Sequence, residues 1–358
     1  MPLISMPRGQ KPFTVAPDPS TVPIPAPVSE AEASLFRALA DLSQELRRLG
    51  LQQENELAIL LTRRDVEAVL TLVTETLNEA ATATRLSSRI TTPLTISAHH
   101  YALTQARTLL ASLPPDDVRE MLIRAAAGEL GGPPGTTPPF SPPASSVPRL
   151  YLRTTLSRVN PRVAAFASSA AYDLIVQFSD ELRSTVRALT TRAVTGEFTA
   201  TDLARRLVRT LPLHSRFAQA VDNHYQGLLT SGATPSRARE LADAYAERLR
   251  RTRSLNIART EVMRAAEAGR RATWESVAEL GLLTRADAGV EWLVGPSGWA
   301  GIDVCRKCAP LAGAIVPYGS WFNGPRGGVP GPPLHPSCRC ATRILPRYYT
   351  DARESGVR

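Results

Sequence analysis

All four cysteines of the 358-residue chain lie in one stretch near the C-terminus. They form a C-x-x-C pair and, after a loop rich in Gly and Pro, a C-x-C pair that a histidine precedes. Thiolates and an imidazole at such spacings are typical of a tetrahedral Zn²⁺ site. The sequence therefore predicts a metal site with more candidate ligands than a tetrahedral shell needs: Cys305, Cys308, His335, Cys338 and Cys340.

The predicted zinc is structural. A shell made only of Cys and His side chains leaves no coordination position for a substrate or an activated water. Arg306, Lys307 and Arg339 stand beside the cysteines and would favour their thiolate form. In so short a segment, zinc would supply much of the folding free energy, on the order of 10 kcal/mol. The alternative is a knuckle of reduced or disulfide-linked cysteines that holds no metal.

Catalytic motifs are absent from the sequence. No histidine is followed two positions later by Glu, so the H-x-E of zinc deaminases is missing, and HEXXH is missing too. The phosphate loop GxxxxGK[ST] is also absent. We therefore predict that the chain is not an enzyme and has no catalytic or cofactor-binding residues.

The charge balance is basic, with 42 Lys and Arg against 33 Asp and Glu and a net charge of +9. Only Lys11 and Lys307 are lysines, a skew that a GC-rich genome explains and that phosphate contact would also explain. The densest basic run is 248–253. It predicts a solvated helix face or, alternatively, a contact with DNA backbone or an acidic protein. Because no aromatic residue interrupts it, any DNA contact would be non-specific and salt-sensitive.

Most of the chain has helical periodicity, so the predicted fold class is mainly α. A capping box is predicted at Ser29 and Glu32. It is followed by a seam of leucines at heptad spacing: Leu35, Leu39, Leu42, Leu46 and Leu49. The seam predicts packing in a bundle or, alternatively, an oligomeric coiled coil. A second stripe runs from Leu57 to Leu77, and further helices are predicted over 97–112, 116–129 and 149–193.

Two helices are predicted between 236 and 280, the first through the basic run and the second over about 254–280. In the second, Ala258, Ala265, Ala268 and Ala272 lie at helical spacing and permit close packing. Glu261 is expected to form a surface ion pair with Arg264, and Glu267 with Arg270 or Arg271. Alternatively, Arg259 and Glu261 anchor the helix to the cysteine region. Thr199 is the predicted N-cap of another helix.

Near Val290 the sequence changes from helical periodicity to short apolar segments. The segment VEWLVG (290–295) is short, rich in apolar residues and bounded by glycine, so it predicts a strand. ATRIL (341–345) is predicted as a closing strand after the second cysteine pair. The chain opens with MPLISMP, too short and too rich in proline for a secretory signal, and no apolar run is long enough to cross a bilayer. We therefore expect folding in a reducing cytosol, without membrane contact.

Three blocks carry a family resemblance. They are GEFTATDLARRL (196–207), NIARTEVMRAAEAG (256–269), and the cysteine block DVCRKCAPLAG (303–313) with PPLHPSCRCA (332–341). Together they resemble the Mu F-like minor head proteins, or head morphogenesis proteins, of tailed bacteriophages. The resemblance spans roughly residues 190–345, and the cysteine block is its most specific part.

The resemblance implies a minor capsid protein that associates with the portal inside the head during assembly. Its partners would be the portal protein, scaffold or major capsid protein, and double-stranded DNA bound non-specifically. Its place would be the virion, after synthesis in the bacterial cytoplasm. The alternatives are a zinc-ribbon-like DNA-binding protein and an enzyme, either a nuclease or an ADP-ribosylating effector, built on the same module.

The expected organisation has helical N-terminal and middle regions followed by a small α+β zinc-stabilised cap. The expected segments are a disordered Pro-rich tail (1–28), an N-terminal helical region (29–130), a Pro-rich linker (131–148), the helical part of the Mu F-like domain (149–283), its zinc-knuckle cap (284–347) and a short tail (348–358).

Overall fold

The computed structural model describes residues 26–63, 65–126, 142–194, 200–210, 213–294, 306–325, 327–348 and 351. These residues belong to two units. The helical unit comprises Ala26–Thr284 and the short segment His335–Cys338. The C-terminal unit comprises Arg285–Leu334 and the residues from Arg339 onward. The mainly helical fold class predicted from the sequence is confirmed.

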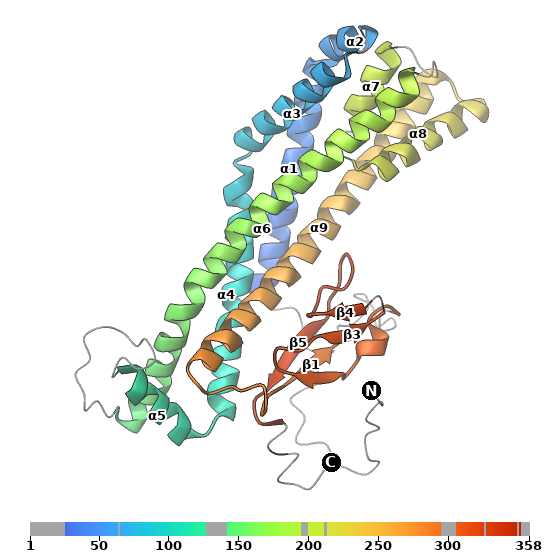
Figure 1. Ribbon diagram of the computed structural model, residues 1–358. Helices are drawn as coiled ribbons and strands as arrows, with labels where there is room; N and C mark the ends of the chain where they lie inside the picture. Colours follow the sequence, from blue (N-terminus) through green and yellow to red (C-terminus); the bar gives the residue numbers. More distant parts are fainter. Residues whose placement is uncertain are drawn as a thin grey trace. The chain divides into compact units, whose positions relative to one another are not determined.

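The helices of the helical unit follow one another along the chain (Figure 1). Their bounds are α1 Ala26–Gln52, α2 Glu54–Thr62, α3 Val66–Ala83, α4 Leu86–Ser112, α5 Pro115–Ala126, α6 Val147–Val194, α7 Ala200–Thr210, α8 Ser215–Thr230 and α9 Pro235–Glu279. A 3₁₀ turn, η1 (Ala144–Ser146), precedes α6.

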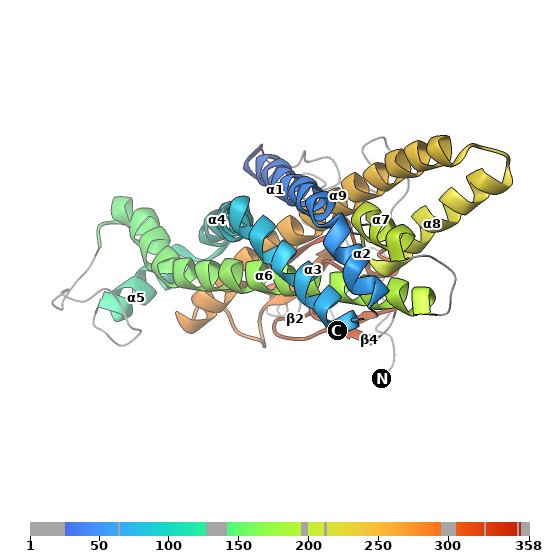
Figure 2. The same cartoon turned by 90° about the horizontal axis from the view of Figure 1, so that it is seen from above.

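Four long helices, α1, α4, α6 and α9, form the core of this unit. Helix α4 contacts each of the other three, and α9 contacts both α1 and α6. Around them, α2 packs against α7, and α8 folds back along α9 as a helical hairpin (Figure 2). Helices from before and after the predicted linker therefore share one core. Residues 127–141, which hold most of that predicted linker, are outside the described part of the chain.

The leucine seam of α1 is buried inside this core. Leu35, Leu39, Leu42 and Leu46 are fully buried and Leu49 is 4% exposed. Since α1 contacts α4 and α9 of the same chain, the seam serves bundle packing. The predicted capping box is wrong: the helix begins at Ala26, and the Ser29 hydroxyl donates to the Ala26 carbonyl at 3.0 Å.

Helix α9 is one continuous helix of 45 residues, where the sequence predicted two. Its start is set by Thr234, whose hydroxyl accepts a hydrogen bond from the Arg237 amide at 3.3 Å, and by Pro235 in the first turn. No Gly or Pro interrupts the chain near 254, so nothing in the local sequence ends the helix there.

Small residues let α4 and α9 approach closely. A Cβ atom placed on Gly269 would lie 2.0 Å from the Ala98 carbonyl oxygen, so only glycine fits there. Two hydroxyls join the backbones directly: Ser97 donates to the Val262 carbonyl at 3.0 Å, and Thr273 to the Ala102 carbonyl at 3.2 Å. Of the alanines predicted to permit close packing, Ala258, Ala265 and Ala272 are buried and Ala268 is half-buried.

The C-terminal unit is built on a three-stranded antiparallel sheet in the order β2-β1-β5. Its strands are β1 Gly289–Leu293, β2 Ile315–Pro317 and β5 Ala341–Leu345, and a second hairpin pairs β3 Phe322–Gly324 with β4 Gly327–Val329. A 3₁₀ turn, η2 (Ala309–Leu311), lies between β1 and β2. Both strands predicted from the sequence, at VEWLVG and ATRIL, are present as β1 and β5.

The core of this unit is small. Trp292 is fully buried and meets Phe322 edge to face, with ring centroids 5.2 Å apart. On the sheet, Glu291 stands opposite Arg343, and the Arg343 Nε donates to its carboxylate at 2.9 Å. Two aromatic rings and a few aliphatic side chains are little apolar surface for a unit of this length.

Some predictions fall on residues outside the described part of the chain. They include the N-cap at Thr199, the first cysteine, Cys305, and nearly all of the predicted N-terminal tail. Among the described residues, no helix is both long enough and apolar enough to cross a membrane.

Candidate metal centre

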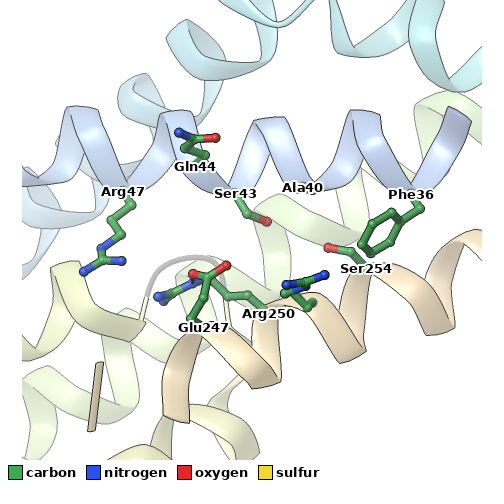
Figure 3. Close-up of a pocket in the computed structure, with 9 residues that line it drawn as sticks. Phe36, Ala40, Ser43, Gln44, Arg47, Glu247, Arg250 and Ser254 are labelled. Atoms are coloured by element: carbon green, nitrogen blue, oxygen red, sulfur yellow. Dashed lines mark hydrogen bonds and ion pairs between the residues drawn. The ribbon is translucent and has the colours of Figure 1, made fainter. Parts of the chain in front are cut away.

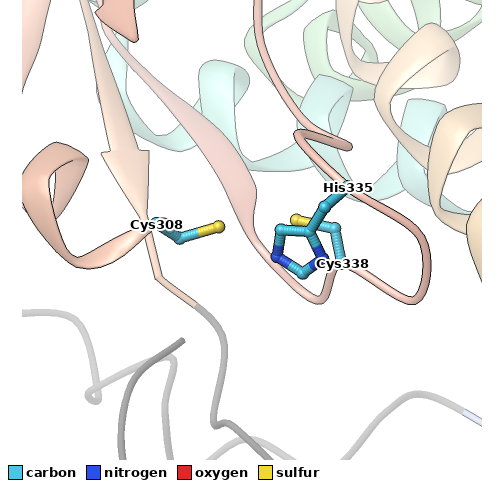
Figure 4. Close-up of side chains that lie close together, drawn as sticks. All are labelled: Cys308, His335 and Cys338. Carbon is cyan, nitrogen blue, oxygen red and sulfur yellow. The ribbon is translucent and has the colours of Figure 1, made fainter. Parts of the chain in front are cut away.

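Three predicted ligands come together in the structure. The Sγ atoms of Cys308 and Cys338 and a ring nitrogen of His335 all lie within 4.8 Å of one another (Figure 4). Both cysteines are fully buried, whereas His335 is half-buried. Two soft thiolates and one imidazole at this separation form a donor set that could hold a metal ion.

Local backbone geometry positions each ligand. Cys308 lies directly before η2, and its carbonyl accepts a hydrogen bond from the Leu311 amide at 2.9 Å. The Cys338 amide donates to the His335 carbonyl at 3.1 Å, which closes a tight turn. Ser337 within this turn has a φ of 58°, a left-handed conformation that few non-glycine residues adopt. The turn therefore brings His335 and Cys338 to the same side.

The His335 ring has one nitrogen suited to a metal. Its Nδ1 lies 2.9 Å from the Pro336 carbonyl oxygen. A carbonyl oxygen can only accept, so Nδ1 carries the proton in this contact. The lone pair of the neutral ring is then on Nε2, the arrangement by which proteins orient a metal-ligating histidine.

The two other candidate ligands are not part of this trio. Cys340 is 4% exposed and follows Cys338 by two positions, and Cys305 is outside the described residues. The side chains of Arg306 and Lys307, expected to favour the thiolates, are exposed beside Cys308.

The turn that carries His335 and Cys338 is bound to α9. The Ser337 amide donates to the Thr260 hydroxyl at 2.9 Å, and the Ser337 hydroxyl donates to the Asn256 side-chain oxygen at 2.8 Å. Asn256 and Thr260 are one helical turn apart, so they present their polar atoms on one face. The blocks NIARTEVMRAAEAG and PPLHPSCRCA, far apart in the sequence, are therefore in direct contact.

These three polar residues were missed in the sequence. Asn256, Thr260 and Ser337 are common surface residues, and nothing local distinguishes them. The one available indication was the i, i+4 spacing of Asn256 and Thr260 inside the block that carries the resemblance.

The ion pairs predicted within the same block are present: Glu261 pairs with Arg264, and Glu267 pairs with Arg270 and Arg271. The Arg259 Nε lies 2.9 Å from the Glu32 carboxylate of α1, so Arg259 joins two helices of the core and does not anchor the cysteine region. Glu261 pairs with Arg264 at 3.2 Å, yet it is only 7% exposed. Burial raises the pKa of the Glu261 carboxyl above its usual value, against the opposing effect of Arg264.

The basic run 248–253 is not a solvated helix face, which corrects that prediction. Arg250 is 3% exposed; it pairs with Glu247 at 3.1 Å and donates to the Arg209 carbonyl at 2.7 Å. Arg253 is 7% exposed and pairs with Glu181 of α6. Only Arg248 and Arg251 of the run's arginines are exposed. Half of the arginines that suggested nucleic-acid contact thus pack between helices.

Comparisons with known proteins do not assign the chain to a family. No family model matches the chain, and no match was found among curated proteins or among solved structures.

Proposed function

We propose that the chain is a minor head protein of a tailed bacteriophage, of the Mu F-like kind, which joins the portal during head assembly. One observation carries this proposal. The two blocks on which the resemblance mainly rests are in contact through the hydrogen bonds of Ser337 to Asn256 and Thr260. A resemblance that arose by chance in separate segments would give no reason for those segments to meet.

The proposal includes a structural zinc ion. Cys308, His335 and Cys338 supply three ligands, and Cys305 or Cys340 supplies the fourth. Such a shell is closed, so the ion would stabilise the fold and take no part in catalysis.

Metal analysis tests the zinc. Protein purified under reducing conditions should carry about one zinc per chain, as one tetrahedral shell requires. Cys308→Ser and Cys338→Ser should each lose it. Cys305→Ser and Cys340→Ser, compared side by side, identify the fourth ligand, because only one of them should lose metal. Zinc-free protein from a zinc-supplemented culture would contradict the proposal.

Co-expression with the cognate portal protein tests the assembly role. The full chain should co-purify with portal at low and moderate salt, and native mass spectrometry should detect the complex. The full chain is the right probe, since α1 and α4 share a core with α6 and α9 and a fragment would expose that core. A matched co-expression with a portal protein from an unrelated phage controls for non-specific capture.

The alternatives predict different outcomes. A zinc-ribbon-like DNA reader would select one DNA sequence over another and leave portal unbound. A nuclease would cleave DNA in the presence of a divalent cation. Portal binding without sequence selection or cleavage supports head assembly, and failure to bind portal at any salt concentration would remove its main support.

A further inference from the structure

A cavity of about 500 Å³ opens between α1 and α9 within the helical unit (Figure 3). Arg47, Ser43 and Phe36 line it from α1, and Arg250, Arg251 and Ser254 line it from α9. In Figure 3 the ring of Phe36 lies at one end and the side chain of Arg47 at the other. The volume is in the usual range for sites that hold small organic ligands.

The charge of the lining is positive. Three guanidinium groups, of Arg47, Arg250 and Arg251, face one carboxylate, of Glu247, which leaves a net formal charge of +2. Within the described part of the chain, neither Arg47 nor Arg251 has an ion-pair partner. Two of the three cations are thus not neutralised by a carboxylate.

Arg250 is a fixed, buried member of this group. It is 3% exposed, and its bonds to Glu247 and to the Arg209 carbonyl hold the guanidinium in one orientation. Burial lowers the pKa of Arg250, and the charge of Arg47 lowers it further, whereas Glu247 and Asp243 raise it. An anion bound in the cavity would offset both the burial and the repulsion between the arginines.

We propose that this cavity binds a small organic phosphomonoester. Its phosphate would lie among Arg47, Arg250 and Arg251, since the planar guanidinium presents paired donors that match phosphate oxygens. The hydroxyl of Ser254, on α9, is a further polar group of the lining, whereas the Ser43 hydroxyl, on α1, already donates to the Leu39 carbonyl at 2.8 Å. The organic part would lie against Phe36 and Ala40, the apolar part of the lining.

A small ligand fits these observations better than a DNA backbone does. The most buried guanidinium, that of Arg250, is inside the cavity, where a single phosphate group can enter. A duplex presents its phosphates in a row and needs a row of exposed cations. Of the three arginines only Arg251 is exposed. This inference is independent of the role in head assembly.

Calorimetric titration of the full chain with adenosine 5′-monophosphate tests the proposal. Binding should be saturable, inorganic phosphate should compete, and adenosine should not bind. Arg47→Gln and Arg251→Gln should each weaken binding about tenfold, because each removes a charge-assisted hydrogen bond. Glu247→Gln should strengthen binding, because it removes the carboxylate.

Arg48→Gln is the matched control, since Arg48 adjoins Arg47 in sequence but pairs with Glu45 and does not line the cavity. It should bind like the wild type. Thermal unfolding of each variant verifies that it is folded. The proposal is overturned if the wild type shows no binding at millimolar ligand, or if Arg47→Gln and Arg251→Gln bind as the wild type does. Duplex DNA binding that the monophosphate cannot displace, without binding of the monophosphate itself, would overturn it too.

Discussion

The helical unit and the C-terminal unit are stabilised in different ways. The helical unit has long helices whose buried side chains run along their whole length, with Ala and Gly at the closest crossing. The C-terminal unit has short strands around Trp292 and Phe322. A large core can supply most of the stability of a unit by itself, while units with a small core usually need an added cross-link such as a disulfide or a metal ion.

The units also differ in how they use charge. Buried and half-buried ion pairs join separate helices of the helical unit, among them Arg206 with Asp222 and Arg253 with Glu181. In the C-terminal unit the cross-strand pair of Arg343 and Glu291 is half-buried on a sheet. The arginine-rich composition thus contributes to helix packing, where a guanidinium can pair and also cover an aromatic ring, as Arg253 does over Phe178 at 4.6 Å.

The largest expected effect is that of removing the proposed metal ion, which should affect the two units differently. Chelation or His335→Ala should expose the amides of β1 and β5 to hydrogen exchange while those of α4 stay protected. The physical reason is that a structural zinc contributes on the order of 10 kcal/mol to the folding of a small unit. His99→Ala, in α4, is the control. Equal protection with and without metal would show that the small core suffices.

Breaking a buried ion pair should have the next largest effect. Arg206 and Asp222 have side chains 9% and 6% exposed, so Asp222→Ala removes the carboxylate that pairs with a buried guanidinium. We expect a loss of about 3–5 kcal/mol in the free energy of unfolding, measured by urea denaturation. Glu240→Ala, whose pair with Arg237 is exposed, should cost about 0–1 kcal/mol. Similar losses in both variants would contradict the account of the helical core.

Two glycines of the helical unit should respond in opposite directions. Gly269→Ala forces a methyl group into the Ala98 backbone and should cost about 1–3 kcal/mol by separating α4 from α9. Gly227→Ala, in α8, meets nothing within 4 Å and should gain up to about 1 kcal/mol from helix propensity. Urea denaturation of both variants measures the difference. A neutral Gly269→Ala would mean that the helices are not in close contact there.

The smallest effect concerns Glu261, whose pKa is raised by burial. As the pH rises above the usual value of 4.5, the unfolded state loses this proton before the folded state does, so folding loses stability. Glu261→Gln should therefore stabilise the protein at neutral pH, and the gain should vanish as the pH falls below 4.5. Denaturation at both pH values measures it, with Glu275→Gln, an exposed residue of the same helix, as the control. A gain that does not depend on pH would contradict this explanation.

Local patterns in the sequence were enough to predict much of the fold. The leucine seam of α1, the alanines of α9 and the strands at VEWLVG and ATRIL all depend on periodicity and on residues close by in the chain. The cysteine block likewise placed Cys308, His335 and Cys338 in one candidate site, because ligand spacing within tight turns is a local property. The start of α1 could not be predicted in the same way, because Ser29 fits a capping pattern yet lies inside the helix.

Only the tertiary structure decided which residues meet. A basic run looks the same in sequence whether its side chains face water or another helix, so Arg250 and Arg253 were predicted to be solvated and are buried. The bonds of Ser337 to Asn256 and Thr260, the pair of Arg259 with Glu32, and the cavity between α1 and α9 all join residues distant in the chain. Periodicity determines which face of an element is apolar, but the choice of partner depends on how all the faces pack together.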